Sequence, residues 1–299
     1  MKIVFTGNCQ AQALTQMTHF LNLGVELIVP PPVFETEAFS SNEVREKILS
    51  ADFIFAQRVS ENYSVDYIRP SALKALAPNR HLIWPNIYFD GYFPGIRYMY
   101  AGSGGKVTGP LSDYHFNQVQ KSWLAGATVE EAWNLLSSED VDIQNDRTPI
   151  ETSISMLRER ESACDITMSD FIEHNFHQEK LFYSMNHPSD RTLLEALSRM
   201  LDRAQIGISI KDKNVEDLRG FPYTLNEIDL PTLPYVSRLY GLKPDHSSNV
   251  TGRDLAFIDN QWKASENRKE YSGIEMVDAF YRVYDSIKNT NSHLTQGYD

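Results

Sequence analysis

The 299-residue chain contains only two cysteines, Cys9 and Cys164. A secreted protein stabilised by disulfides carries more cysteines, usually at short spacings. Thiolate metal sites also use closely spaced pairs. The wide separation of the two therefore predicts thiols that are not joined to each other in a reducing compartment, and it indicates no metal site.

Long hydrophobic runs are also missing. The N-terminus, Met1 to Gly7, has one basic residue and an apolar run of three residues, which is too short for the core of a signal peptide. No stretch approaches the ~20 apolar residues that a membrane-spanning helix needs. We therefore expect a cytoplasmic protein without a membrane span.

Acidic residues outnumber basic residues, and the formal net charge is -12. A field of this sign repels nucleic acid and anionic lipid, so neither is expected as a general partner. It leaves room for a local cationic pocket. The share of hydrophobic residues, 41%, and of charged residues, 23%, is ordinary for a globular protein.

Short apolar runs alternate with helical patterns in the first third of the chain. We expect strands at 2–5, 25–29, 52–56 and 81–84, with helices at 11–23, 41–49 and 64–76. This alternation is typical of a parallel sheet with crossover helices. The predicted fold class is α/β, with a parallel sheet and flanking helices.

The middle of the chain is mostly helical. We expect helices at 113–125, 128–136, 149–161 and 169–176, then a strand at 180–184 and a helix at 191–204. The segment 211–242, rich in proline and aromatic residues, is expected to be largely loop. We predict one α/β domain over 1–285 with a helical insertion near 111–180, and a frayed C-terminal tail over 286–299.

The turn Gly7-Asn8-Cys9-Gln10 follows the first strand, where ligands of parallel sheets bind. Asn8 is a good N-cap, which puts Cys9 in the first turn of a helix. The helix dipole there favours the thiolate, which is the nucleophilic form. The same N–H groups, near Gln10, can hold an oxyanion. The alternative is that Cys9 is a small buried residue, as we expect for Cys164, which lacks this setting.

A thiol nucleophile needs a base nearby, and two histidines have suitable settings. His187 lies in a loop between a predicted strand and a predicted helix, and His115 lies at the start of a predicted helix. We take both as candidate catalytic residues. The alternative for each is a histidine that only hydrogen-bonds a loop.

Several residues are candidates for binding a phosphorylated donor. The glycine-rich stretch from Tyr98 to Lys106 offers backbone N–H groups and the Lys106 ammonium, although it equally fits a surface loop. Arg58 and Arg97 are further anion-binding candidates. Gln57 and Asn86 follow two strands, so both are expected to face the same cleft.

Two of these motifs resemble the SGNH hydrolase and acyltransferase superfamily. Gly7-Asn8-Cys9 is similar to its Gly-Asp-Ser nucleophile motif, and Ser184-Met185-Asn186-His187-Pro188 to its Asp-x-x-His-Pro base loop. The resemblance implies an SGNH or Rossmann-like core. Cysteine replaces the serine, and Ser184 replaces the aspartate that orients the base, so another carboxylate, such as Asp190, would have to serve.

An ordered set of motifs is more similar to the WcbI family of capsular polysaccharide biosynthesis proteins, regarded as acetyltransferases that bind coenzyme A. The motifs are Gly7-Asn8-Cys9-Gln10, Ala56-Gln57, Pro85-Asn86 with Gly91-Tyr92, Gly109-Pro110 with Asp113-Tyr114-His115, and Asn186-His187-Pro188. The resemblance implies acetyl transfer from acetyl-CoA to the hydroxyl of a sugar or polysaccharide precursor. Asn8 and Tyr114 join the residues expected at the cofactor.

The sequence thus predicts cysteine-dependent acyl transfer, with Cys9 as nucleophile and His187 as general base. A direct transfer without a covalent intermediate stays open. Three alternatives also stay open: an esterase acting on acetylated sugar, a non-catalytic binding protein, and a glycosyl- or sulfotransferase. Binding of coenzyme A would separate an acetyltransferase from an esterase.

Overall fold

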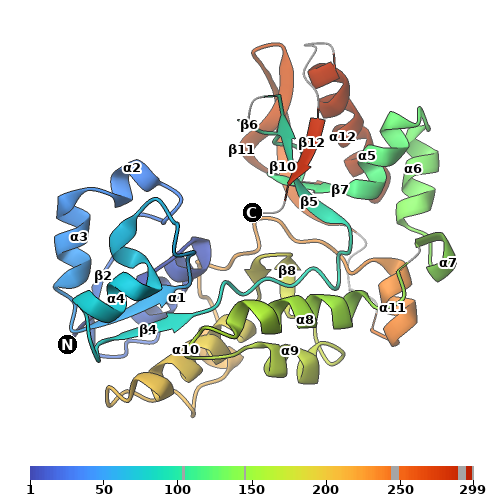
Figure 1. Ribbon diagram of the computed structural model, residues 1–299. Helices are drawn as coiled ribbons and strands as arrows, with labels where there is room; N and C mark the ends of the chain where they lie inside the picture. Colours follow the sequence, from blue (N-terminus) through green and yellow to red (C-terminus); the bar gives the residue numbers. More distant parts are fainter. Residues whose placement is uncertain (103–104, 145, 244–248, 289–293, 298–299) are drawn as a thin grey trace. The chain divides into compact units, whose positions relative to one another are not determined.

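The computed structural model describes residues 1–102, 105–144, 146–243, 249–288 and 294–297 (Figure 1). The chain divides into two compact units, each made of three stretches. Unit 1 contains Met1–Tyr88, Ile154–Asn175 and Asn186–Leu225. Unit 2 contains Phe89–Ser153, Phe176–Met185 and Asn226–Asp299.

The single domain over 1–285 stays a prediction. So does the frayed tail over 286–299, because residues 289–293 and 298–299 lie outside the described residues.

Unit 1 is built on four parallel strands in the order β2-β1-β3-β4. The strands are β1 (Lys2–Thr6), β2 (Glu26–Ile28), β3 (Phe53–Gln57) and β4 (His81–Trp84). All four lie within two residues of the predicted positions, and the α/β class with a parallel sheet is confirmed. The strand order reverses between β1 and β3, and the carboxyl ends at such a point form the usual ligand crevice of an open parallel sheet.

Helices cover both faces of this sheet. Side chains alternate along a strand, so Val4 and Ile54 face one side, where they join a core cluster with Ile48 of α3. Phe5 and Phe55, one position further along, face the other side and stack with ring centroids 4.9 Å apart. Helix α1 (Cys9–Phe20) packs on β1 at this side, and α10 (Asp190–Ala204) packs on β4. Both faces of the sheet are therefore shielded from water, as its continuous apolar strands require.

The helices of unit 1 begin where the sequence provides caps. Ser41 caps α3, Pro70 opens α4, and Ser189 caps α10. The elements are α1 (Cys9–Phe20), α2 (Thr36–Phe39), α3 (Asn42–Leu49), η1 (Asp66–Ile68), α4 (Pro70–Leu76), α9 (Ser169–Asn175), β9 (His187–Pro188), α10 (Asp190–Ala204) and η2 (Val215–Leu218). Helix α8 (Pro149–Glu161) runs from unit 2 into unit 1.

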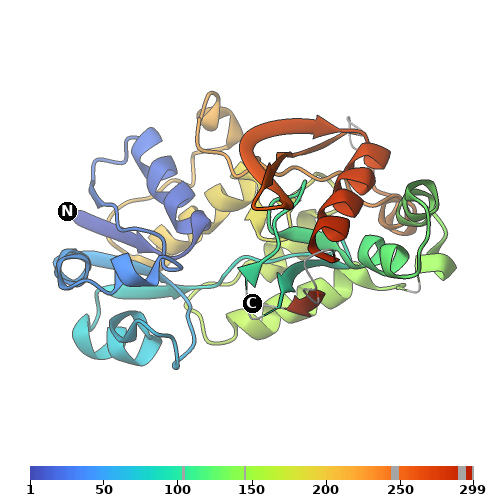
Figure 2. The ribbon, with the colours of Figure 1, turned by 90° about the horizontal axis from the view of Figure 1, so that it is seen from above.

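Unit 2 has antiparallel strands and its own helices (Figure 2). Strand β5 pairs with β6, β7 and β12, and β10 pairs with β11. The strands are β5 (Ile96–Ala101), β6 (Gly105–Lys106), β7 (Tyr114–Phe116), β8 (Phe182–Ser184), β10 (Val250–Ile258), β11 (Gln261–Tyr271) and β12 (Leu294–Gly297). The helices are α5 (Asn117–Leu124), α6 (Val129–Leu136), α7 (Val141–Gln144), α11 (Pro234–Tyr240) and α12 (Gly273–Lys288).

The helices predicted for the middle of the chain are present, with one correction. Helices α6, α8 and α9 lie within one residue of the predicted bounds. The helix predicted over 113–125 begins only at Asn117, because Tyr114–Phe116 pairs with β5 as strand β7. The predicted loop over 211–242 contains η2 and α11.

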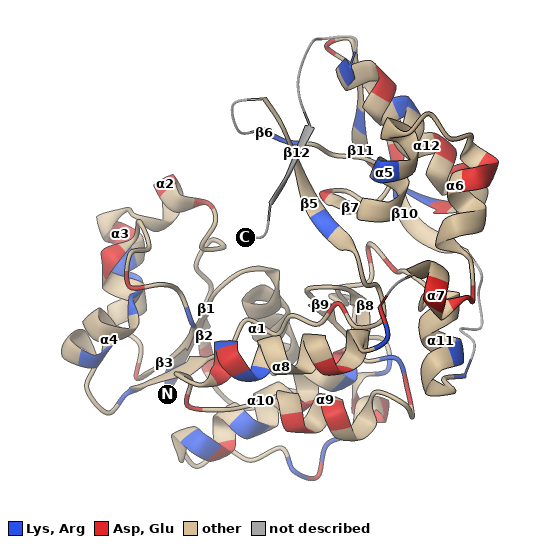
Figure 3. Ribbon diagram, turned by 45° about the vertical axis from the view of Figure 1, so that its right-hand side comes forward, with Lys and Arg blue, Asp and Glu red and all other residues tan. Residues whose placement is uncertain are grey.

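Charged residues of opposite sign occur on the same helices. Helices α8 and α10 each carry residues of both signs (Figure 3). Among the described residues, no helix combines the length and apolar character needed to cross a membrane.

Candidate active site

The turn after β1 depends on the close packing of Gly7 and on Asn8, which caps the helix that follows. An added Cβ at Gly7 would lie 2.8 Å from Cβ of Gln57 and 3.0 Å from Cβ of Ala11, so glycine lets β1, β3 and α1 meet this closely. The Oδ1 atom of Asn8 accepts a hydrogen bond from the backbone N–H of Gln10 at 3.0 Å. The predicted N-cap is therefore confirmed, and helix α1 begins at Cys9.

Cys9 lies at the carboxyl end of β1, where the strand order reverses. The residue is partly exposed, and it forms no disulfide. N–H groups of the first helical turn and the positive end of the helix dipole surround this position. The position is the one on which the prediction of a thiolate at Cys9 rests, and the thiolate itself stays a prediction.

The two neighbours of Cys9 in the sequence belong to a hydrogen-bonded group of four side-chain amides. We call this group the amide network; its members are Asn8, Gln10, Gln57 and Asn86. The Gln57 Oε1 atom accepts from the backbone N–H of Asn8 at 2.9 Å, and its Nε2 donates to Gln10 Oε1 at 3.1 Å. Asn86 Oδ1 accepts from Gln10 Nε2 at 3.3 Å and from Asn8 Nδ2 at 3.5 Å. Gln57 and Asn86 are thus joined through Gln10, while the cleft that both are predicted to face stays a prediction.

Gln10 is the centre of this network and is fully buried. Its Oε1 accepts from the backbone N–H of Ile87 at 3.1 Å. Its Nε2 lies 2.9 Å from the carbonyl of Ile87 and 2.8 Å from the carbonyl of Asn186. One side chain therefore joins the Cys9 turn to the segment after β4 and to the loop that carries His187.

His187 opens β9 directly after Asn186. Loss of water around the ring lowers the pKa of His187 to about 4, so its imidazole is neutral at pH 7 and able to accept a proton. Nδ1 is shielded from solvent. Three residues on, Asp190 begins α10, and burial raises the pKa of its carboxyl to about 6.

Four of the predicted donor-binding or catalytic residues belong to unit 2: Arg97, Lys106, Tyr114 and His115. Arg97 lies 3.6 Å from the Asp90 carboxylate, and the Lys106 ammonium lies 3.7 Å from Asp113. Tyr114 is buried in β7. Residues 103 and 104 of the glycine-rich stretch lie outside the described residues.

His115 is buried in unit 2, and both ring nitrogens are occupied. Its Nε2 lies 3.0 Å from the carbonyl of Val107, and its Nδ1 lies 3.0 Å from the hydroxyl of Tyr284. Burial lowers its pKa to about 4. A general base has to present a nitrogen to the proton that it removes. We therefore leave His115 out of the mechanism proposed below.

Arg58 and Cys164 lie in unit 1. Arg58 is exposed, and its backbone N–H donates to the carbonyl of Trp84 at 2.8 Å. Cys164 packs against the core cluster, and burial raises the pKa of its thiol to about 12. This agrees with its expected structural role, because a thiol of such high pKa is a poor nucleophile.

The sequence did not reveal that Gln10 supports the site through its side chain. The available signal was weak, because Gln10 is one of several polar residues in α1 and its sequence position does not distinguish it from Gln12 or Gln16. Within the described part of the chain, no group of three or more His, Cys, Asp or Glu side chains is placed to hold a metal ion.

Comparisons with known proteins bear on the family and the fold of the chain. A family model described as polysaccharide biosynthesis enzyme WcbI matches residues 2–208. One solved structure, of WcbI itself, is 20% identical with a TM-score of 0.66, and the match covers 96% of this chain and 90% of that one. It is described as a novel polysaccharide biosynthesis enzyme, in a native form without a disulfide bond between coenzyme A and a cysteine. No curated protein matches the chain. At this identity, the structural match shows a shared fold.

Proposed function

Because the chain belongs to the WcbI family of polysaccharide biosynthesis enzymes, we propose that it transfers an acetyl group from acetyl-coenzyme A to a hydroxyl of a sugar or polysaccharide precursor. The family supports a sugar as the acceptor. The similar WcbI structure supports the donor, because the native form of that protein is distinguished by the absence of a disulfide bond between coenzyme A and one of its cysteines.

The setting of Cys9 is the observation that carries the proposal. A partly exposed thiol begins a helix at the ligand-binding edge of a parallel sheet. In the proposed reaction, the Cys9 thiolate attacks the thioester carbonyl carbon, and the carbon–sulfur bond to coenzyme A breaks. The coenzyme leaves as a thiolate that takes up a proton, and the acetyl group stays on Cys9.

The second half of the reaction needs a base. In the proposal, the neutral imidazole of His187 removes the proton of the acceptor hydroxyl as its oxygen attacks the acetyl carbon. The bond between that carbon and the Cys9 sulfur then breaks, and the thiolate returns. A pKa of about 4 leaves the His187 ring neutral over the whole neutral range.

The amide network supports these steps by holding the two loops. Among the described residues, hydrogen bonds engage both amide atoms of Gln10 and Gln57, but only the Oδ1 atom of Asn86. We therefore assign Gln10 and Gln57 to positioning. The Nδ2 group of the partly exposed Asn86, with N–H groups of the first turn of α1, is the proposed oxyanion donor.

The test begins with binding. Coenzyme A at about 100 times its Kd should stabilise the protein by about 2.7 kcal/mol, which a thermal shift assay detects. An esterase acting on acetylated sugars would show no such shift. The absence of any shift with coenzyme A or acetyl-coenzyme A would therefore contradict the proposal.

Trapping then tests the nucleophile. The protein incubated with acetyl-coenzyme A and no acceptor should gain the mass of one acetyl group, mapped to Cys9. Cys9→Ala should lose the adduct, and Cys164→Ala should keep it. Stabilisation by coenzyme A and acetyl transfer to a sugar without any trapped adduct would instead support direct transfer, with His187→Ala as the inactivating variant.

Thiol alkylation gives an independent check on the two cysteines. At pH 8, iodoacetamide should modify Cys9 and leave Cys164 largely unmodified, because burial raises the Cys164 pKa to about 12. Bound coenzyme A should slow the modification of Cys9. Peptide mapping by mass spectrometry reads out both sites, and preferential labelling of Cys164 would contradict the assignment.

A further inference from the structure

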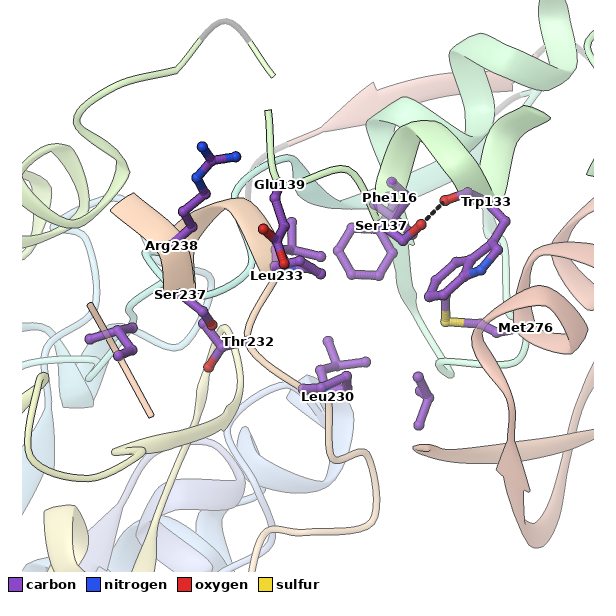
Figure 4. A pocket seen from close by; sticks show the side chains of 15 residues that line it. Phe116, Trp133, Ser137, Glu139, Leu230, Thr232, Leu233, Ser237, Arg238 and Met276 are labelled. Atoms are coloured by element: carbon purple, nitrogen blue, oxygen red, sulfur yellow. Dashed lines mark hydrogen bonds between the residues drawn. The ribbon is translucent and has the colours of Figure 1, made fainter. Parts of the chain in front are cut away.

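Unit 2 contains a cavity that the acyl-transfer mechanism does not use. Its volume is about 520 Å³, within the ~300–1,000 Å³ of small-ligand sites. Figure 4 shows Trp133 and Met276 on one side, Leu233 beside the ring of Phe116, and Leu230 lower in the view. These five side chains make the walls mainly apolar, so the cavity favours a ligand with a substantial apolar part.

The position of Trp133 in the cavity wall is fixed by contacts within unit 2. Trp133 lies on α6, whose first turn is fixed by a capping box between Thr128 and Glu131. Its ring lies against Gly273 so closely that an added Cβ there would overlap the indole. Ser137 Oγ donates to the Trp133 carbonyl at 2.7 Å (Figure 4). The cavity wall is therefore held in place by the fold of unit 2.

Polar groups lie at one end of the cavity. Glu139 and Arg238 line it there and are both exposed, and Ser237 adds a hydroxyl (Figure 4). One anion, one cation and a hydroxyl suit a neutral, hydroxylated group better than a carboxylate. A fatty acid would bring its carboxylate to Glu139 and into the field of a chain with net charge -12. A bare sugar would leave the apolar walls in contact with water.

We propose that unit 2 binds a neutral amphiphile, a saccharide linked to an apolar aglycone, with the aglycone in this cavity and the sugar at the end marked by Glu139 and Arg238. The identification of such a molecule with the acceptor of acyl transfer rests on the proposed function. Binding itself does not, because none of the lining residues takes part in the proposed chemistry.

Calorimetry with alkyl glucosides tests the proposal. Hexyl, heptyl and octyl β-glucosides, each below its micelle concentration, should bind with Kd falling about fourfold for every added methylene. Methyl glucoside should bind much more weakly, and octanoate more weakly than octyl glucoside. A Kd independent of chain length would overturn the proposal, and octanoate as the tightest ligand would overturn the choice of a neutral head group.

Two variants locate the site. Ser237→Trp fills the cavity and should abolish binding of octyl glucoside. Leu124→Trp adds the same side chain at an exposed position of unit 2 that does not line the cavity, and should bind normally. Equal binding by the two variants would refute the location. Stabilisation by coenzyme A, measured on both, shows whether the site at Cys9 is intact and keeps the two proposals separate.

Fluorescence provides a readout that does not depend on filling the cavity. Octyl glucoside should change the intrinsic tryptophan emission of the unmodified protein. Trp133→Phe should remove that change and keep calorimetric binding within a few-fold, since the other three tryptophans do not line the cavity. Persistence of the full fluorescence change in Trp133→Phe would place the ligand elsewhere.

Discussion

Replacing Gln10 by methionine isolates the contribution of the amide network to stability. Methionine has nearly the same shape and helix propensity as glutamine but forms no comparable hydrogen bonds. The change strands both backbone groups of Ile87, a residue with 0% exposure, and also removes a partner from Gln57 and from the Asn186 carbonyl. Each buried polar group without a partner costs ~1–3 kcal/mol, so the two groups of Ile87 alone predict a loss of ~2–6 kcal/mol.

Urea denaturation followed by far-UV circular dichroism measures this loss. Gln12→Met is the matched control, because it makes the same substitution two residues along α1 at an exposed position. It should change the free energy of unfolding by no more than ~0.5 kcal/mol. If Gln10→Met lost no more stability than Gln12→Met, the network would not hold the turn, and the reasoning would be wrong. Under conditions where both variants are folded, acyl transfer should fall in Gln10→Met alone, because its Cys9 turn and His187 loop are no longer joined.

Two further predictions concern packing and pH. Gly7→Ala should lower the free energy of unfolding by ~1–3 kcal/mol, because the new methyl group would lie 2.8 Å from Gln57, whereas Gly105→Ala, which meets nothing within 4 Å, should be tolerated in thermal denaturation. His115 should titrate near pH 4 by NMR, against about 6.5 in the unfolded chain. The unfolded state therefore takes up the proton first, and His115 should remove up to ~3 kcal/mol of stability as the pH falls from 6.5 to 4. An imidazole resonance for His115 that shifts near pH 6.5 would sink this prediction.

Local chemistry made much of unit 1 predictable. Strand β4 and the capped start of α1 depend on neighbouring residues: an apolar run in one case, and an asparagine that bonds the N–H two positions on in the other. The setting of Cys9 follows from two local signals of the same kind, the apolar run of β1 and the Asn8 cap of α1. The grouping of Gln57 with Asn86 also follows, because parallel strands end at one edge of their sheet.

The features that the sequence did not predict depend on contacts between residues that lie far apart in the chain. Gln10 forms hydrogen bonds with backbone groups 77 and 176 residues away, and no local sequence pattern predicts these partners. His115 opens an apparently helical run, yet Tyr114–Phe116 becomes a strand because β5 is there to pair with it. The burial of His115 depends on Tyr284, 169 residues further on. Such outcomes follow from tertiary contacts that override local preference.

The way Gln10 recognises its partners has a consequence for how the family can diverge. It bonds main-chain atoms at positions 87 and 186, and a carbonyl is the same group in every amino acid. Related chains can therefore exchange the side chains at those two positions without losing these hydrogen bonds, provided that proline stays out of position 87, while position 10 has to retain its amide. Methods that search for pairs of positions changing together should find no signal between position 10 and positions 87 and 186, and any signal for position 10 should come from its side-chain partners Gln57 and Asn86.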